Sequence, residues 1–593
     1  MTLRLRDHWL MLDLRSVGLF RAAIGAVLLL HLLGRWSLRG DFYSPRGVLP
    51  VALLAGSTEI PHFPTLLSAL EGHSWEIDLY FGVALLAALA LTVGLFTRGA
   101  ALLSLLAFST LAHRNPYVLI AGDYVLGSML LWLTVLPAGK RYSVDVVLSG
   151  RRHTNPQRER GRDTEAAEMG LVSRTPALAH AARGCGRLFC ASTRGALPTR
   201  LNDEARFKED TQSRPSLAVL GVLLQLGLVY LATAWQKTGP TWWRDGTAIS
   251  HMLGLDRFAR PGAAIACSLP ESWLVALTHG VLGFEFLALP LIVLPFARPW
   301  LRRVALLGLL ALHIGIACVL DTGGFTITML ACTPLLLSSA DWAWGAQLVA
   351  RCTHPAIPCE VRDETSERGG VSPLVLGRKP SCEEPGGLRH PAQNFPTSCR
   401  VRDQKTAWHM LSVVAIELAS VWLLVGMVAS NYGLNFAIGP REAPRPWLDL
   451  PQRFAAAHQR WDMFAPDAPQ FDPQLVVRVR LRDGRLLGLQ RDDELPSAGI
   501  DLAPRLRPFA SRIYIGHAIL QFNPARRQEA EALRTELCRF VLRELTANGH
   551  SPRDIHAIEL WSRSVPTSRR ERNTPLPEPV FVSRLLVPDS SAH

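Results

Sequence analysis

Nine apolar segments, most of them long enough to cross a bilayer, constrain the fold of this 593-residue chain more than any other feature. A membrane-spanning helix needs about 20 mostly apolar residues, because the hydrocarbon core of a bilayer is about 30 Å thick. The segments lie at residues 17–33, 79–96, 100–111, 118–136, 217–235, 274–295, 304–320, 325–337 and 408–430. The third and the eighth are short, as tilted or re-entrant segments would be. We therefore predict a polytopic α-helical membrane protein with about nine spans.

The positive charge of the chain falls on one side of this predicted topology. The formal net charge is +13, and much of the excess lies in connections such as residues 140–214 and 351–405. Arg4, Arg6 and Arg15 precede the first apolar segment. Because Lys and Arg are retained on the cytoplasmic side, we predict a multi-pass protein of the cell (inner) membrane with a cytoplasmic N-terminus and an extracytoplasmic C-terminal region. This distribution argues against nucleic-acid binding.

Two polar stretches divide the predicted membrane domain. Both are rich in Arg, Pro, Gly, Ser and Glu and lack apolar periodicity, so we expect flexible cytoplasmic insertions. The predicted organisation is a transmembrane domain in two parts (residues 1–147 and 215–340), insertions at residues 148–214 and 341–407, a last transmembrane helix at residues 408–430, and an outer domain at residues 431–593.

The outer domain has the pattern of a small α+β fold. Residues 475–481 alternate partly between apolar and polar side chains, and the pair Asp483-Gly484 separates them from residues 486–489, which predicts a hairpin. Apolar residues then recur every four positions, which predicts an amphipathic helix that ends at Asn548-Gly549. These residues are Leu533, Leu537, Val541 and Leu545. A further strand is expected at residues 555–561.

Lys237 is the first residue of chemical interest, because it follows the apolar run 217–235 directly. Trp235, Trp242 and Trp243 surround it in the sequence. Lysine beside tryptophan at the end of a span is typical of an interfacial anchor, whose amine extends to the membrane surface. The alternative is a base that is kept away from water, since desolvation favours the neutral amine that can accept a proton. The sequence leaves both interpretations open.

Glu285 and His313 lie well inside two other apolar runs. An ionisable side chain that faces lipid is costly, so both are expected to face the interior of the helix bundle or a cavity. Each has a structural alternative: Glu285 as a hydrogen-bonded residue or the partner of a cation, and His313 as a satisfied core residue. No second histidine lies one helical turn from His313, so no metal site is expected.

Several short motifs follow one another along the predicted spans and the start of the outer domain. In chain order they are Arg114-Asn115, Gly122-Asp123, Leu136-Pro137, Ser143-Val144-Asp145, Lys237-Thr238 followed by Trp242 or Trp243 and Gly246, Gly323-Gly324-Phe325, and Trp461-Asp462-Met463-Phe464-Ala465-Pro466. Together they resemble the horizontally transferred transmembrane (HTTM) domain family, the bacterial relatives of vitamin K-dependent gamma-carboxylase. Glu285 and His313 lie where that family has a glutamate and a histidine in consecutive spans.

The resemblance implies a carboxylase-like lyase that uses reduced vitamin K or another quinol as cofactor. In that family the quinol and oxygen give a strong base, which removes a γ-proton from a peptide glutamate that carbon dioxide then traps. Lys237 would be the base that deprotonates the quinol, with Glu285 and His313 positioning the ligand or tuning the lysine. We expect four further residues to contact the cofactor: Trp235, Trp242, Asn115 and Asp123. The expected partners are the lipid bilayer and a secreted peptide or protein.

Other function classes remain open at this point. The carboxylases follow their lysine with leucine and aspartate, whereas Lys237 precedes Thr238-Gly239-Pro240. A non-catalytic membrane protein whose outer domain binds a secreted partner, in export or immunity, is the main alternative. A transporter is a weaker one, because we find no internal inverted repeat.

Overall fold

A computed structural model describes the helical part of the chain and most of the C-terminal sheet. The described residues are 9–45, 47–54, 67, 73–152, 212–294, 299–353, 399–431, 447, 450–457, 461, 463–489, 527–568 and 577–588. They form two compact units, one of Met1–Ser339 with Glu417–His593 and one of Ala340–Ile416. The second unit contains most of helix α20 (Ser339–Thr353) and the beginning of helix α21 (Cys399–Ala429).

Six helices in the described part of the chain are long and apolar enough to cross a membrane. They are α2 (Leu14–Trp36), α6 (Ser74–Val93), α13 (Leu217–Gln236), α17 (Glu271–Val293), α18 (Trp300–Val319) and the segment Met410–Ala429 of α21. The structure thus supports a polytopic α-helical membrane protein, but the count of nine spans is not confirmed. The other three predicted segments fall on α7 (Thr97–Arg114), on the 15-residue α8 (Ala121–Val135), and on α19 (Phe325–Cys332) with the 3-10 turn that follows it.

Capping side chains mark the starts of two helices. The side chain of Asp13 accepts a hydrogen bond from the Arg15 N–H at the start of α2, and Ser216 caps α13 in the same way. Such side chains satisfy N–H groups that have no partner inside the helix. These caps hold the first turns of two helices that carry residues of both sites described below.

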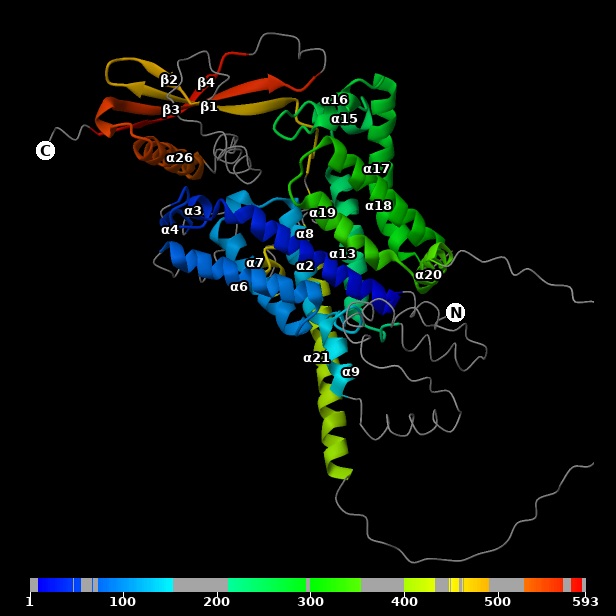
Figure 1. The fold of residues 1–593 in the computed structure, drawn as a ribbon. Helices are drawn as coiled ribbons and strands as arrows, with labels where there is room; N and C mark the ends of the chain where they lie inside the picture. Colours follow the sequence, from blue (N-terminus) through cyan, green and yellow to red (C-terminus); the bar gives the residue numbers. More distant parts are fainter. Residues whose placement is uncertain are drawn as a thin grey trace, which may run out of the picture. The chain divides into compact units, whose positions relative to one another are not determined.

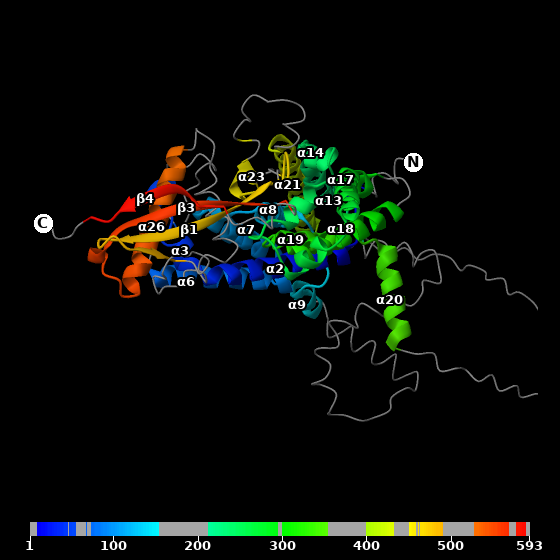
Figure 2. The same cartoon turned by 90° about the horizontal axis from the view of Figure 1, so that it is seen from above.

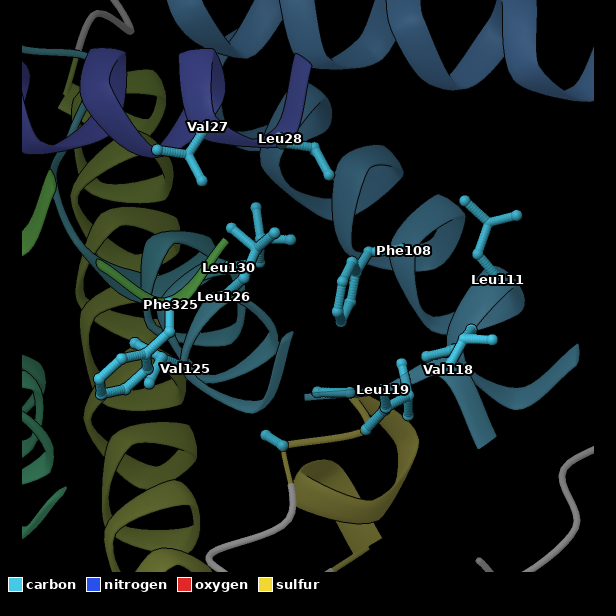
Figure 3. Packing of buried hydrophobic residues seen from close by; sticks show 14 of the residues in the cluster. Val27, Leu28, Phe108, Leu111, Val118, Leu119, Val125, Leu126, Leu130 and Phe325 are labelled. Atoms are coloured by element: carbon cyan, nitrogen blue, oxygen red, sulfur yellow. The ribbon is translucent and has the colours of Figure 1, made fainter. Parts of the chain in front are cut away.

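Helices α2, α8, α13 and α19 form the centre of the first unit. Helix α2 packs against α6, α8 and α19, while α13 packs against α17 and α8, and α18 joins α17 to α19. Figure 3 shows the apolar contacts at this centre, where Val27 of α2, Phe108 of α7, Leu126 of α8 and Phe325 of α19 approach one another. In a bilayer, close packing of such side chains favours the association of the helices, because lipid tails are as apolar as the side chains and burial alone gives little gain.

The C-terminal part contains a four-stranded antiparallel sheet with the strand order β2-β1-β3-β4. The strands are β1 (Phe471–Leu481), β2 (Leu486–Gly488), β3 (Ile555–Pro566) and β4 (Val580–Leu586), and helix α26 (Arg527–Ala547) lies along one face (Figures 1 and 2). The predicted hairpin, the predicted helix and the third predicted strand are thus confirmed. Gly484 has φ 87° in the hairpin turn, a conformation that glycine adopts without strain.

The region before the sheet packs with the membrane helices. The short helix α23 (Leu450–Phe454) contacts α8, and the carbonyl of Phe454 accepts a hydrogen bond from Ser109 of α7. The two polar insertions lie largely outside the described residues. Three of their described ends are helical, as parts of α9 (Val144–Arg152), α20 and α21, whereas residues 212–214 are not helical and Gln212 forms an isolated bridge with Asp13.

Candidate functional site

Lys237 ends helix α13 and is held by the turn that follows it. Its backbone N–H donates to the Ala234 carbonyl at 3.2 Å, and Gly239-Pro240 then begins the short helix α14 (Pro240–Trp243). This turn brings Trp242 beneath the amine, with Nζ 4.1 Å from the centre of the indole ring. The Trp243 indole N–H donates to the Lys237 carbonyl at 2.6 Å. The local sequence therefore fixes both the backbone and the amine of Lys237.

The amine of Lys237 forms a buried ion pair with Glu285 of α17. Nζ donates to the two carboxylate oxygens at 2.6 and 2.7 Å, and the residues are only 4% and 6% exposed. Removing two charges from water costs several kcal/mol per ion, and only close contact of the kind seen here offsets that. Because the amine points inward to a carboxylate, it does not reach the surface as an interfacial anchor does.

His313 of α18 contacts Tyr230 and not the ion pair. Its Nε2 is 2.6 Å from the Tyr230 hydroxyl, and its ring packs edge-on against Tyr230 and against Phe325 at 5.5 Å between centres. Tyr230 lies on α13 and precedes Lys237 by seven residues, about two helical turns. Of the three predicted catalytic residues, Lys237 and Glu285 are in contact, and His313 is linked through Tyr230 to the helix that Lys237 caps.

Lys237 and Glu285 line a cavity of about 880 Å³ between helices α13 to α18. This volume is within the range of small-molecule sites, which are typically lined by apolar side chains with few polar groups. The apolar part of the lining includes Trp242, Met252, Leu277, Phe284, Leu312, Phe325, Met463 and Phe464. The ion pair therefore lies in the wall of a large apolar cavity, with an aromatic ring directly beside its amine.

The segment Met463–Asp467 closes one side of the cavity and was not predicted as part of the site. The Trp242 indole N–H donates to the Phe464 carbonyl at 3.0 Å, and the Gly239 N–H donates to the Pro466 carbonyl at 2.8 Å. Asp467 accepts hydrogen bonds from the backbone N–H of Thr241, at 3.1 Å, and from its hydroxyl. The last residues of the motif around Trp461 thus dock on the turn at Lys237.

The four residues predicted to contact the cofactor lie in four different places. Trp242 lines the cavity, whereas Trp235 is 48% exposed and packs against Phe286. Asn115 is buried at the end of α7, where its amide donates to the Phe42 carbonyl at 3.0 Å. Asp123 belongs to a separate buried cluster with Arg35 and His31. The structure thus brings only Trp242 to the Lys237–Glu285 pair.

No group of three or more His, Cys, Asp or Glu side chains with metal-site geometry occurs in the described ranges. The chain was compared with family models, with curated proteins and with solved structures, and none of them matches it.

Proposed function

We propose that the cavity binds an amphipathic quinol, such as reduced vitamin K, with a ring hydroxyl at the Lys237–Glu285 pair. The observation that carries this proposal is a buried ion pair in the wall of an 880 Å³ cavity that is otherwise almost wholly apolar. Apolar side chains suit the ring and tail of such a ligand, and the pair supplies a polar contact for its hydroxyl. A protein that needed only a stable bundle would gain nothing from a buried ion pair at this position.

Lys237 and Glu285 act together as the proton acceptor in this proposal. The ion pair carries no net charge, and the Glu285 carboxylate is its member that can accept a proton. When the pair takes up one more proton from the ligand hydroxyl, it becomes an ammonium beside a neutral acid. The positive charge then faces the negative charge left on the ligand, and Trp242 holds the ammonium over its ring.

His313 and Tyr230 serve as positioning residues. Their hydrogen bond fixes the hydroxyl of Tyr230 on the helix that ends at Lys237. Phe325, which lines the cavity, packs on the His313 ring. A change at His313 therefore acts on the ligand through the cavity wall.

The wider proposal is that the chain is a member of the HTTM family with carboxylase-like chemistry. Its support is the order of the sequence motifs, together with the contact between Lys237 and Glu285 and the hydrogen bond that joins His313 to Tyr230 on α13. Reduced vitamin K, when bound, supplies with oxygen the strong base that removes a γ-proton from a peptide glutamate. The residues of this chain would bind and orient it, exclude water and accept its hydroxyl proton.

Two glycines of α17 offer a matched test of ligand binding. Gly280 lines the cavity and Gly283 does not, and a Cβ atom added at either position meets no atom within 4 Å. Full-length protein purified in mild detergent should carry a quinone in its lipid extract and bind added reduced vitamin K. We expect Gly280→Leu to lose the quinone and Gly283→Leu to retain it. A wild-type extract without quinone, together with no binding of the added quinol, would overturn the proposal.

The non-catalytic alternative is favoured by one observation, the exposed apolar edge of the sheet. On β4, Val580, Phe581 and Leu586 are 70%, 46% and 59% exposed. An edge strand of this kind can pair with a partner chain. If the protein only binds a secreted partner, its function in the cell should be retained in Gly280→Leu and lost in Phe581→Ser. The quinol proposal predicts loss in Gly280→Leu and retention in Phe581→Ser.

A further inference from the structure

A second polar cluster lies where α2 meets the start of α8, apart from the Lys237 site. Asp123 accepts hydrogen bonds from the Arg35 guanidinium at 2.8 Å and from the Ile120 N–H at 3.0 Å, both at Oδ2. Its other oxygen, Oδ1, lies 3.2 Å from His31 Nδ1. Arg35 also donates to the Tyr43 hydroxyl. The charge of Asp123 is thus neutralised by Arg35, and its second oxygen is left to orient the imidazole.

The contact between His31 and Asp123 is a charge contact at 3.2 Å and not a hydrogen bond, yet it favours one tautomer of His31. A lone pair on Nδ1 would face the negative carboxylate of Asp123, so the proton is favoured on Nδ1 and the lone pair on Nε2. No described residue hydrogen-bonds to Nε2, and this nitrogen is not among the enclosed polar atoms that lack a partner. His31 lines a cavity of about 320 Å³. Its Nε2 is therefore an oriented hydrogen-bond acceptor that is accessible to a molecule in that cavity.

The rest of the cavity is mainly apolar and reaches the surface of the helix bundle. Its lining includes Val27, Leu30, Leu38, Val118, Leu126 and Ile327. Leu30 is 59% exposed on a helix long enough to span a membrane. A ligand can therefore enter from the bilayer. The volume is at the low end for ligand sites and suits a ring or a short chain.

The two cavities share no lining residue, but they share a wall. Thr322 and Phe325 line the Lys237 cavity, and Gly323, Gly324 and Ile327 line the His31 cavity. The segment of residues 322–328 thus separates two cavities, each with one polar cluster.

We propose that the His31 cavity is a second binding site for an apolar molecule with a hydroxyl group, which donates its hydrogen bond to His31 Nε2. A structural role for the cluster explains Arg35 and Asp123, because a buried guanidinium needs a partner. It does not explain why an imidazole is oriented by the same carboxylate so that its acceptor is open to an apolar cavity. The hydroxyl belongs either to a phenol or quinol ring or to an aliphatic lipid alcohol.

Binding of small probes to the full-length protein tests this proposal. The titrations use the Gly280→Leu variant, in which binding to the Lys237 cavity is blocked. At constant detergent concentration they compare the affinity for 4-propylphenol with that for 4-propylanisole, which lacks the hydroxyl donor. We expect the phenol to bind about tenfold more tightly, as the loss of one hydrogen bond predicts. His31→Phe should remove this preference and leave the affinity for the ether unchanged. If 1-hexanol binds as tightly as 4-propylphenol, the natural ligand is a lipid alcohol. If 1-hexanol binds more weakly, the natural ligand is a phenol or quinol. Both outcomes retain the hydroxyl contact with His31.

Two glycine substitutions, one inside the cavity and one outside it, test the proposal if His31→Phe does not fold. Gly34 lines the cavity and Gly99 of α7 does not, and a Cβ atom added at either position meets no atom within 4 Å. Gly34→Leu should abolish binding of the phenol, and Gly99→Leu should not change it. The proposal is overturned if the unaltered His31 cavity binds 4-propylphenol and 4-propylanisole with equal affinity. It is also overturned if Gly34→Leu binds the phenol as tightly as Gly99→Leu does.

Discussion

Lys237 illustrates how far one residue can be interpreted from its neighbours. Three tryptophans and the end of an apolar run are compatible with an anchor at the membrane surface or with a base in a dry site. The structure turns the amine inward to Glu285, a residue 48 positions away. His313, by contrast, pairs with Tyr230, which no motif had indicated. The partner of each buried polar group decides its chemistry, and the partner is set by helix packing.

At this scale the first prediction concerns the ion pair. Lys237→Met leaves the Glu285 carboxylate buried without its partner, which should destabilise the protein by about 3–5 kcal/mol. The double variant Lys237→Met/Glu285→Leu should recover most of that loss, since apolar side chains suit the cavity wall. Thermal unfolding in detergent measures both. A double variant no more stable than the single one would contradict this view, whereas a stable double variant that fails to bind the quinol would separate function from stability.

At the scale of elements, the turn after α13 and the segment before β1 fit each other closely. A Cβ atom at Gly239 would lie 2.4 Å from Asp467 Cγ, so only glycine allows this contact. The sequence shows Gly239-Pro240 as a helix start and the segment around Trp461 as a separate motif. Their contact closes the cavity, and it could not be predicted because the two segments are more than two hundred residues apart.

Gly239→Ala should displace the segment Met463–Asp467 and open the cavity. Overpacking of this kind costs about 1–3 kcal/mol, and the quinol affinity should fall together with the thermal midpoint. Gly283→Ala is the matched control, since the added methyl group meets no atom within 4 Å. Unchanged quinol binding in Gly239→Ala would show that this segment is not part of the site.

The sheet carries a pH-dependent element. Burial alone would raise the pKa of Glu559, but the hydrogen bond and charge of Arg480 and the charge of Arg584 outweigh it and hold that pKa below its usual value of 4.5. A lowered folded-state pKa stabilises the protein above the unfolded-state value, and this contribution is lost as the pH falls through the folded-state pKa.

The thermal midpoints of wild type and Glu559→Gln should therefore differ most at about pH 7 and converge as the pH falls below about 4.5. Asp483→Asn, which removes an exposed pair with Arg485, serves as the control and should have little effect at any pH. A Glu559→Gln difference that stays constant across this range would show that the ion pairs of Glu559 do not contribute to the pH dependence.

At the scale of the whole molecule, hydropathy alone indicated apolar helices of membrane-spanning length, and periodicity indicated the hairpin β1–β2, helix α26 and strand β3, whereas strand β4 had no counterpart in the sequence-based prediction. Both are local properties: the length of an apolar run, the spacing of apolar side chains and the turn at Gly484 are set by adjacent residues. Only the tertiary structure decided that Lys237 meets Glu285, that Trp235 and Asp123 lie elsewhere, and that His31 opens into a second cavity. These contacts join residues far apart in the chain, and they depend on how each helix is rotated about its axis against its neighbours. The sequence of a span does not determine this rotation, because most faces of an apolar helix are alike.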